Sequence, residues 1–143
     1  LQAYTDLIEA VLMRMNKTGD EMQIADMLEQ IDKKYLQDEA TDSFKNLYQA
    51  LRDDISKVVA KNSYNTGYAA FRAEDYDTAI KNLERAYQYD PSNGEALYNL
   101  GNSYNKKGDT SKAAEIYEQV VALFPNTEKA RKSQNYIRQI KGE

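Results

Sequence analysis

The chain has 143 residues, a formal net charge of −4, no cysteine and no histidine. Without those two residue types it has no disulfide, thiolate nucleophile or histidine base, so serine–histidine–aspartate and cysteine–histidine catalysis are excluded within this chain. We therefore expect no enzyme activity, no metal site and no other cofactor. The acidic balance argues against nucleic acid as the main partner, and no apolar run is long enough for insertion into a membrane.

The N-terminal part begins with two predicted amphipathic helices. Apolar residues keep helical spacing from Tyr4 to Met15, and Gly19 is placed to cap the end of this first helix. Asp20 and Gln23 resemble a capping box that opens a second helix. The predicted buried stripe of the second helix consists of Ile24, Met27, Leu28, Ile31 and Tyr35.

A third helix is predicted to start after Thr41, which is suited to cap it. No glycine or proline intervenes before Gly67, so this helix can continue into the next one, at 62–73. Its predicted inner face consists of Phe44, Leu47, Tyr48, Leu51, Ile55, Val58 and Val59. The residues from Phe44 to Val58 also alternate like a short coiled-coil seam of about two heptads, fewer than a coiled coil needs. We expect this face to pack against the first two helices, with dimerisation as the alternative.

The most informative feature follows: residues 60–93 and 94–127 repeat with a period of 34 residues. A period of this length indicates stacked supersecondary units. The aligned identities are Tyr64/Tyr98, Asn65/Asn99, Gly67/Gly101, Asp75/Asp109, Ala79/Ala113, Glu84/Glu118 and Pro91/Pro125.

The second repeat fits a known pattern closely and the first fits it more loosely. The second reads Leu97-x2-Leu100-Gly101-x2-Tyr104, Ala113-x3-Tyr117, Pro125, and the first reads Ser63-x2-Thr66-Gly67-x2-Ala70, Ala79-x3-Leu83, Pro91. On these residues the chain resembles the tetratricopeptide repeat family. The resemblance implies an all-α helical solenoid, with two repeats at 61–127, N-terminal helices at 1–60 and a C-terminal capping helix at 128–143.

Glycine in the middle of a helix costs about 1 kcal/mol relative to alanine, so Gly67 and Gly101 indicate close approach of a neighbouring helix. We expect Ala79 and Ala113 to be the small residues that face them. The prolines of each repeat end its second helix, because proline cannot continue the hydrogen-bond ladder.

The turn inside the second repeat has a clear signature. Gly108 is expected to cap the end of one helix and Asp109 the start of the next. The first repeat has Glu74 where that glycine would be, so its turn is less well defined by sequence.

After the repeats, Thr127 is placed to cap a last helix that ends near Lys141. Asn135 stands where the repeats have glycine, and a polar outer face is what a solenoid needs to end in water. The predicted inner stripe is Ala130, Ser133, Tyr136, Ile137 and Ile140.

In tetratricopeptide arrays the first helix of each pair lines a concave groove for an extended peptide or a partner helix. The resemblance therefore implies a groove made of Tyr64, Tyr68, Phe71, Arg72, Tyr98, Asn99, Asn102, Asn105, Lys106, Lys129, Lys132 and Tyr136. Asparagine can pair with both groups of a peptide backbone, tyrosine suits interfaces, and the lysines favour an acidic ligand. We expect the groove asparagines to be solvated, so that replacing Asn102 leaves stability almost unchanged.

Several of these residues have alternative interpretations. Tyr64 and Phe71 can instead pack against the N-terminal helices and fill part of the groove, and Lys106 and Lys107 can be ordinary solvated charges. Three further tyrosines are predicted to be core residues: Tyr76, Tyr104 and Tyr117.

Some members of the family bind the C-terminal carboxylates of chaperone tails through a clamp of lysine, arginine and asparagine. Asn99 and Lys129 match two clamp positions, whereas Tyr64, Tyr68 and Ser133 stand at positions that the clamp gives to other residues. We therefore do not expect a chaperone-tail receptor.

The repeats imply a non-catalytic scaffold that binds a protein or peptide, and the alternative is a structural spacer or a homodimerisation module whose groove is unused or blocked. The style of Tyr64–Phe71, Asp75–Asp90 and Leu97–Pro125 also resembles bacterial envelope-associated tetratricopeptide proteins. In those proteins the repeats follow a membrane anchor and a helical spacer. That likeness favours an extracytoplasmic, anchored location through sequence upstream of Leu1, with a cytoplasmic location as the alternative.

Overall fold

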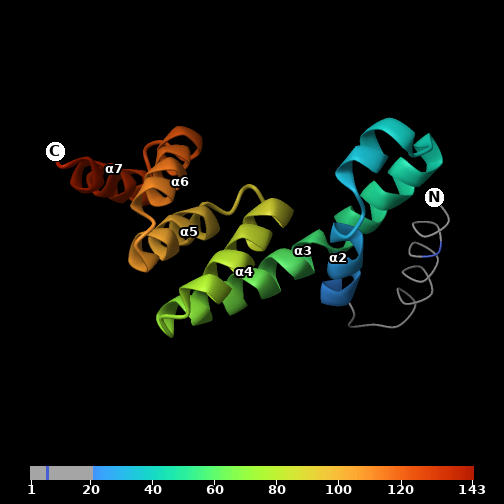
Figure 1. The fold of residues 1–143 in the computed structure, drawn as a ribbon, viewed down its shortest axis with the longest axis horizontal. Coiled ribbons are helices and arrows are strands. Elements are labelled where there is room, and N and C mark those ends of the chain that lie inside the picture. The colour runs from blue at the N-terminus through green and yellow to red at the C-terminus, as the bar shows by residue number, and fades with distance from the viewer. Residues whose placement is uncertain (1–5, 7–20) are drawn as a thin grey trace. The chain divides into compact units, whose positions relative to one another are not determined.

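A computed structural model describes residues 6 and 21–143, and these residues form helices joined by short turns (Figure 1). The described residues contain no strand, so the all-α prediction is confirmed for them. Among them no helix has both the length and the apolar composition needed to cross a membrane. Apart from Asp6, the predicted first helix lies outside the described residues, as do Gly19 and Asp20.

The chain divides into two compact units, Leu1–Val59 and Ala60–Glu143. The predicted boundaries at residues 60 and 127 stay predictions.

In the first unit, helix α2 spans Glu21–Glu29 and ends earlier than predicted. The amide of Ile31 donates to the carbonyl of Leu28 at 3.2 Å, a tight closing turn. The Asp32 carboxylate then accepts the Lys34 amide at 2.7 Å. This local side-chain bond competes with helix continuation, so the predicted stripe does not lie on one helix.

The apolar side chains of that stripe are buried both before and after the break in the helix. Ile24, Leu28, Ile31 and Tyr35 are all buried. Tyr35 opens a π-helical turn, η1, at Tyr35–Glu39, and its ring meets Phe44 edge-on at a centroid distance of 5.4 Å. The hydrophobic pattern therefore predicts which residues are inside even where it misjudges the length of the helix.

Helix α3 spans Asp42–Arg72 without a break, so the predicted continuation past the third helix is confirmed. The Thr41 hydroxyl accepts the Phe44 amide at 3.2 Å, which confirms the predicted cap. Val58 is 39% exposed, whereas Val59 beside it is buried, so the placement of Val58 on the inner face is wrong. At this level the buried residues of the helix are Val59 and Ala60.

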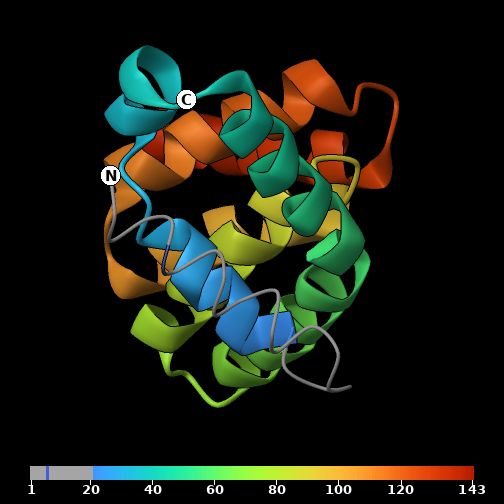
Figure 2. The same ribbon diagram turned by 90° about the vertical axis from the view of Figure 1, so that its right-hand side faces the viewer.

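The second unit consists of two helical hairpins and a last helix (Figure 2). The first hairpin joins α3, from Ala60 onward, to α4 at Tyr76–Tyr89. The second joins α5 at Gly94–Lys107 to α6 at Thr110–Leu123, and α7 at Glu128–Lys141 follows. Helix α5 packs between α4 and α6, and α7 packs on α6. The core of this unit contains Ala79, Leu83, Leu97, Leu100, Ile116 and Val120.

Both mid-helix glycines lie at points of close approach, as predicted. A Cβ atom on Gly67 would stand 2.8 Å from Leu83 Cγ, and one on Gly101 would stand 2.8 Å from Tyr117 Cε1. Real Cβ atoms do not approach other atoms so closely, so any larger residue here must displace its neighbour.

The identity of the facing residues was predicted wrongly. Ala79 and Ala113 are fully buried, yet the atoms nearest the two glycines belong to Leu83 and Tyr117, one helical turn later. Side chains on a helix lean towards its N-terminus, so the large residue one turn on covers the point that the sequence assigned to alanine.

The turns within the two hairpins share one geometry. Gly108 has a φ of 99° and Glu74 a φ of 63°, so both are left-handed. Asp109 and Asp75 then cap the following helices, and their carboxylates accept backbone amides at 3.1 and 3.3 Å. The predicted caps Gly108 and Asp109 are confirmed, and Glu74 adopts the conformation for which glycine is better suited.

The ends of the second helix in each hairpin and the start of α7 also agree with the prediction from sequence. Helix α4 ends at Tyr89 and α6 at Leu123, just before Pro91 and Pro125. The Thr127 hydroxyl accepts the amide of Ala130 at 3.1 Å, which confirms the cap of α7.

Within the predicted stripe of α7, Ala130 and Ser133 are buried, and Tyr136, Ile137 and Ile140 are half-buried. The inner side of the last helix is therefore the predicted one.

Candidate functional site

The predicted groove residues come from three helices of the second unit. We call this set the tyrosine–asparagine face: Tyr64, Tyr68, Phe71 and Arg72 on α3, Tyr98, Asn99, Asn102, Asn105 and Lys106 on α5, and Lys129, Lys132 and Tyr136 on α7. The 34-residue register places them at corresponding turns of the first helix of each hairpin and of the last helix.

A chain of hydrogen bonds joins the centre of this face. The Tyr117 hydroxyl donates to Asn102 Oδ1 at 2.7 Å. Asn102 Nδ2 donates to Asn99 Oδ1, and Asn99 Nδ2 donates to the Tyr64 hydroxyl, both at 3.4 Å. The chain thus connects three helices, α6, α5 and α3.

Tyr117 was predicted as a core residue, and its side chain is fully buried as expected. It was not predicted as part of the site. Its residue type could have indicated this role from the sequence, because the repeat pattern has phenylalanine at this position and a buried tyrosine hydroxyl needs a hydrogen-bond partner. That partner is the amide of Asn102, on the candidate face.

The two central asparagines are not the open amides that the sequence suggested. Asn99 is only 7% exposed and Asn102 is half-buried. Asn102 is the acceptor for the buried Tyr117 hydroxyl, so the premise that this amide is only solvated is wrong, and we instead expect its removal to lower stability.

Aromatic rings flank the asparagines on both sides. Tyr64 and Tyr68 stack with centroids 6.0 Å apart and planes within 9°. Tyr117 stacks on Tyr136 at 5.3 Å and meets Tyr98 at 6.3 Å with a tilt of 47°. Such pairs stabilise one another and hold their hydroxyl groups in defined places.

The hydroxyls of Tyr64, Tyr98 and Tyr117 remain protonated at neutral pH. Burial raises the pKa of Tyr64, and the charge of Glu95 raises it further. Burial also raises the pKa of Tyr98 and, most strongly, that of Tyr117. Each hydroxyl is therefore available as a hydrogen-bond donor.

Two residues with alternative predictions pack on the unit's own core. Tyr64 and Phe71 are half-buried against the core of the second unit, and Phe71 lies 5.9 Å from the ring of Tyr76. Tyr76 and Tyr104 are half-buried, so they are at the edge of the core and less enclosed than predicted. Packing of Tyr64 and Phe71 against the N-terminal helices stays a prediction.

Two of the predicted cations are paired with carboxylates of this chain. Lys129 Nζ lies 3.0 Å from Glu95 Oε1, and this ion pair joins α7 to α5. Lys132 Nζ lies 3.3 Å from Glu128 Oε1 within α7. The positive charge that these two lysines offer to a ligand is therefore partly balanced.

The remaining polar members of the face are more open. Arg72 and Lys106 are exposed, and Asn105 is half-buried. Lys107, next in the chain, is an exposed partner of Asp77 on α4, which makes it a solvated ion-pair residue. Within residues 6 and 21–143, no three or more acidic side chains gather into a possible metal site.

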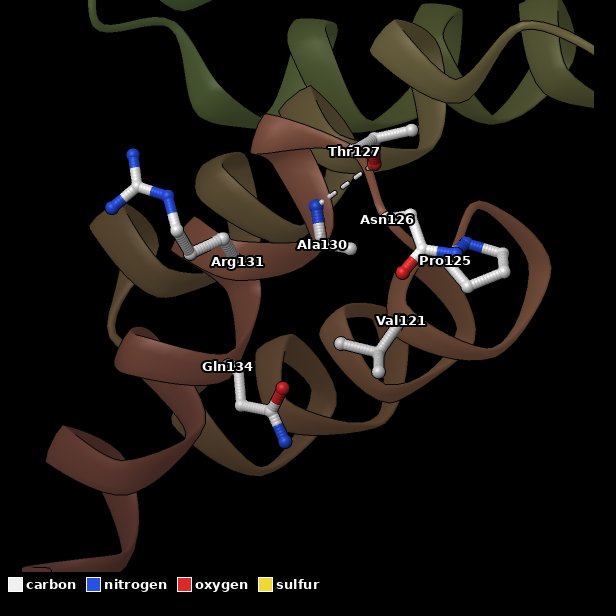
Figure 3. A pocket seen from close by; sticks show the side chains of 7 residues that line it. All are labelled: Val121, Pro125, Asn126, Thr127, Ala130, Arg131 and Gln134. Carbon is white, nitrogen blue, oxygen red and sulfur yellow. Dashed lines mark hydrogen bonds between the residues drawn. The ribbon is translucent and has the colours of Figure 1, made fainter.

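A pocket of about 320 Å³ lies elsewhere, between the end of α6 and α7 (Figure 3). It shares no residue with the tyrosine–asparagine face. Its lining consists of Val121, Pro125, Asn126, Thr127, Ala130, Arg131 and Gln134.

The fold and the face define a repeat protein built from antiparallel helical hairpins. Residues 64–127 match the family model described as tetratricopeptide repeat. Residues 64–127 therefore form tetratricopeptide repeats, and this range includes most of the first hairpin and all of the second. Repeats of this family are protein-interaction scaffolds, so the chain belongs to that general class.

One solved structure similar to this chain is a C-terminal tetratricopeptide-repeat-containing domain from Plasmodium falciparum, in a protein described as an FK506-binding protein. The two chains are 19% identical with a TM-score of 0.48, and the match covers 99% of this chain and 90% of the other.

Proposed function

We propose that this chain is a non-catalytic scaffold that binds an extended or helical segment of a partner protein on the tyrosine–asparagine face. The observation that carries the proposal is the joined row of tyrosines and asparagines on α3, α5 and α7. Tyrosine supplies contact area with little loss of side-chain freedom and a polar tip, which is why interfaces are rich in it.

The exposure of the face supports this role. Tyr68 is 39% exposed, although large aromatic side chains usually avoid water. Tyr98 and Tyr136 are half-buried and Arg72 is exposed. A partner segment that covers these side chains would remove apolar ring surface from water while their hydroxyl groups keep hydrogen bonds.

We also propose that the partner segment carries acidic side chains, chiefly towards Lys106 and Arg72. These two cations are exposed on the α5 and α3 parts of the face. Lys129 and Lys132 contribute less, because Glu95 and Glu128 already lie beside them. An exposed charge acts mainly on association rate and selectivity, so its effect should weaken with salt.

A selection from a random peptide library displayed on phage tests the proposal even though the partner is not identified. The bait is the whole chain, and the affinity of each selected peptide is then measured by fluorescence anisotropy. Two variants change the face, Tyr68→Ala and Lys106→Glu. The matched control, Lys81→Glu, makes the same charge change at an exposed site on α4.

We expect Tyr68→Ala and Lys106→Glu to weaken binding of the selected peptides, whereas Lys81→Glu leaves it unchanged. Added salt should reproduce the loss caused by Lys106→Glu. Peptides that bind all four proteins equally would contradict the proposal. Failure to select any peptide would favour the alternative of a spacer or a self-association module. Sedimentation then distinguishes these two, because only a self-association module has the molecular mass of an oligomer.

A further inference from the structure

We infer that Tyr117 is a specificity-determining residue that acts through Asn102 and Asn99. Its hydroxyl sets the direction in which the hydrogen bonds of the chain are donated. As a result, Tyr64 donates to a neutral acceptor in the ligand, such as a peptide carbonyl. This inference rests on the proposed function of the face. It assigns a binding role to a side chain that is otherwise part of the core.

The first step is that the Tyr117 ring cannot move freely. It is fully buried, stacks on Tyr136 at 5.3 Å, and lies so close to Gly101 that a Cβ atom there would stand 2.8 Å from its Cε1. The position of the hydroxyl group is therefore fixed by packing from both sides.

The second step is that a fixed hydroxyl orients the neighbouring amide. The Tyr117 hydroxyl donates to Asn102 Oδ1 at 2.7 Å, a strong geometry for a hydroxyl donor. With its oxygen held there, Asn102 directs its Nδ2 group to Asn99 Oδ1 at 3.4 Å. The buried tyrosine thus holds the oxygen end of the Asn102 amide, while the Tyr98 hydroxyl contacts the same side chain.

The third step carries this direction to Tyr64. Asn99 is 7% exposed, so its amide has little access to water and follows its protein partners. Its oxygen accepts from Asn102, and its nitrogen donates to the Tyr64 hydroxyl at 3.4 Å. Because the Tyr64 oxygen accepts this bond, the Tyr64 proton is left to donate elsewhere.

The charges around Tyr64 decide which acceptor fits. Burial and the charge of Glu95 raise the pKa of Tyr64, so its hydroxyl keeps its proton. Glu95 is held by Lys129 at 3.0 Å. Although Lys129 partly balances it, the charge of Glu95 disfavours a ligand carboxylate next to Tyr64, whereas a neutral carbonyl oxygen accepts the proton without that repulsion.

The first hairpin provides the contrast. Leu83 occupies the position of Tyr117, 34 residues earlier, and has no polar atom. The repeat pattern itself has phenylalanine at this position. Packing of the helices therefore does not require the hydroxyl, and its effect can be tested by removing one oxygen atom.

The test compares the wild type with Tyr117→Phe, and Tyr104→Phe is the matched control because it removes a half-buried tyrosine hydroxyl on α5 outside the chain of hydrogen bonds. The first readout is NMR relaxation of the side-chain NH2 groups of Asn102 and Asn99. It needs no ligand. We expect both groups to be rigid in the wild type and in Tyr104→Phe, and both to become mobile in Tyr117→Phe. If only Asn102 becomes mobile, or if neither residue does, the inferred effect of Tyr117 along the hydrogen-bond chain is overturned.

The second readout uses the peptides selected from the random library. We expect Tyr117→Phe to weaken their binding by about 2- to 10-fold, the equivalent of one hydrogen bond, while Tyr104→Phe has no effect. Tyr64→Phe should cause the same loss, and combining it with Tyr117→Phe should add little, because both act through one bond.

The two readouts separate failure of this inference from failure of the proposed function. Additive losses in the double variant would overturn the role of Tyr117 and leave peptide binding intact. If the library gives no binder, the proposed function fails, and the role of Tyr117 in ligand choice fails with it. The relaxation data then report only whether the hydrogen-bond chain has the inferred direction.

Discussion

The two hairpins of the second unit share one backbone plan and differ where their helices come closest. In the first hairpin Gly67 faces Leu83, and in the second Gly101 faces Tyr117, and a Cβ atom added to either glycine would lie 2.8 Å from the facing side chain. Leucine only fills space there, whereas tyrosine also sends a hydroxyl to Asn102. The repeat register thus determines the packing, while departures from the register supply the chemistry of the face.

The largest effect should come from filling the close approach in the second hairpin. Gly101→Leu places a bulky side chain against the Tyr117 ring, which is stacked on Tyr136 and cannot retreat. We expect a loss of about 3 kcal/mol in the free energy of unfolding, at the upper end for overpacking. Chemical denaturation measures it.

The last helix offers a matched control for that substitution. Asn135 stands 34 residues after Gly101 and is exposed. Asn135→Leu introduces the same side chain where nothing packs closely, so stability should change by no more than about 0.5 kcal/mol. Equal effects of the two substitutions would show that the helix register is wrong.

A smaller effect is expected from the amides, and the two hairpins again supply the control. Asn99 is buried within the hydrogen-bond chain, whereas Asn65, its counterpart in the first hairpin, is exposed. Asn99→Ala leaves Asn102 and Tyr64 without this shared partner and should cost about 1–2 kcal/mol, while Asn65→Ala should be nearly neutral. Thermal unfolding of both variants checks this, and a loss at Asn65 as large as that at Asn99 would contradict the hydrogen-bond chain.

The turns of the two hairpins should respond in opposite directions. Gly108 has a φ of 99°, so Gly108→Ala should cost about 1 kcal/mol, because residues with a Cβ atom disfavour left-handed backbone. Glu74 already bears that strain at a φ of 63°, and Glu74→Gly should raise stability by about a few tenths of a kcal/mol. Melting temperatures that shift in the same direction for both variants would argue against a shared turn geometry.

The smallest effect concerns the ion pair between Glu95 and Lys129, which links α5 to α7. The Glu95 side chain is more than half exposed, so the pair is screened by solvent. Glu95→Gln should cost about a few tenths of a kcal/mol at low salt and nothing at high salt. Denaturation at two salt concentrations measures the difference, and a loss that salt does not reduce would contradict an electrostatic cause.

Features fixed by local chemistry could be predicted from the sequence. The caps Thr41, Asp109 and Thr127, the left-handed Gly108 and the unbroken α3 helix follow from short-range rules that hold in almost any context. The 34-residue period then predicted which helices pair into hairpins. The all-α repeat architecture therefore needed little information beyond residue type and spacing.

Features that depend on which side chain reaches which partner could not be predicted. The sequence placed Tyr117 in the core correctly, but the direction of its hydroxyl depends on how far α6 is rotated against α5. The same applies to Asn99, which the family groove suggested as solvated and which is buried under its neighbours. Periodicity tells which side of a helix is inside, and it does not tell which polar atoms meet there.

The early end of α2 and the exposure of Val58 have a related cause. A side-chain bond from Asp32 to the Lys34 amide competes with the helix, and periodicity contains no term for such competition. The seven apolar positions assigned to the inner face of α3 also predicted a wider buried face than the helix has. Val58 and Val59 are neighbours in the chain and cannot both lie at the centre of one stripe.

The binding role of the tyrosine–asparagine face is tested most directly by a map of backbone amide shifts in the NMR spectrum when a library-selected peptide is added to the whole chain. We predict the largest changes on that face, at Tyr68, Asn102, Lys106 and Tyr136, with small changes on α4. Changes confined to α4, or to the pocket between α6 and α7, would contradict a binding role for this face.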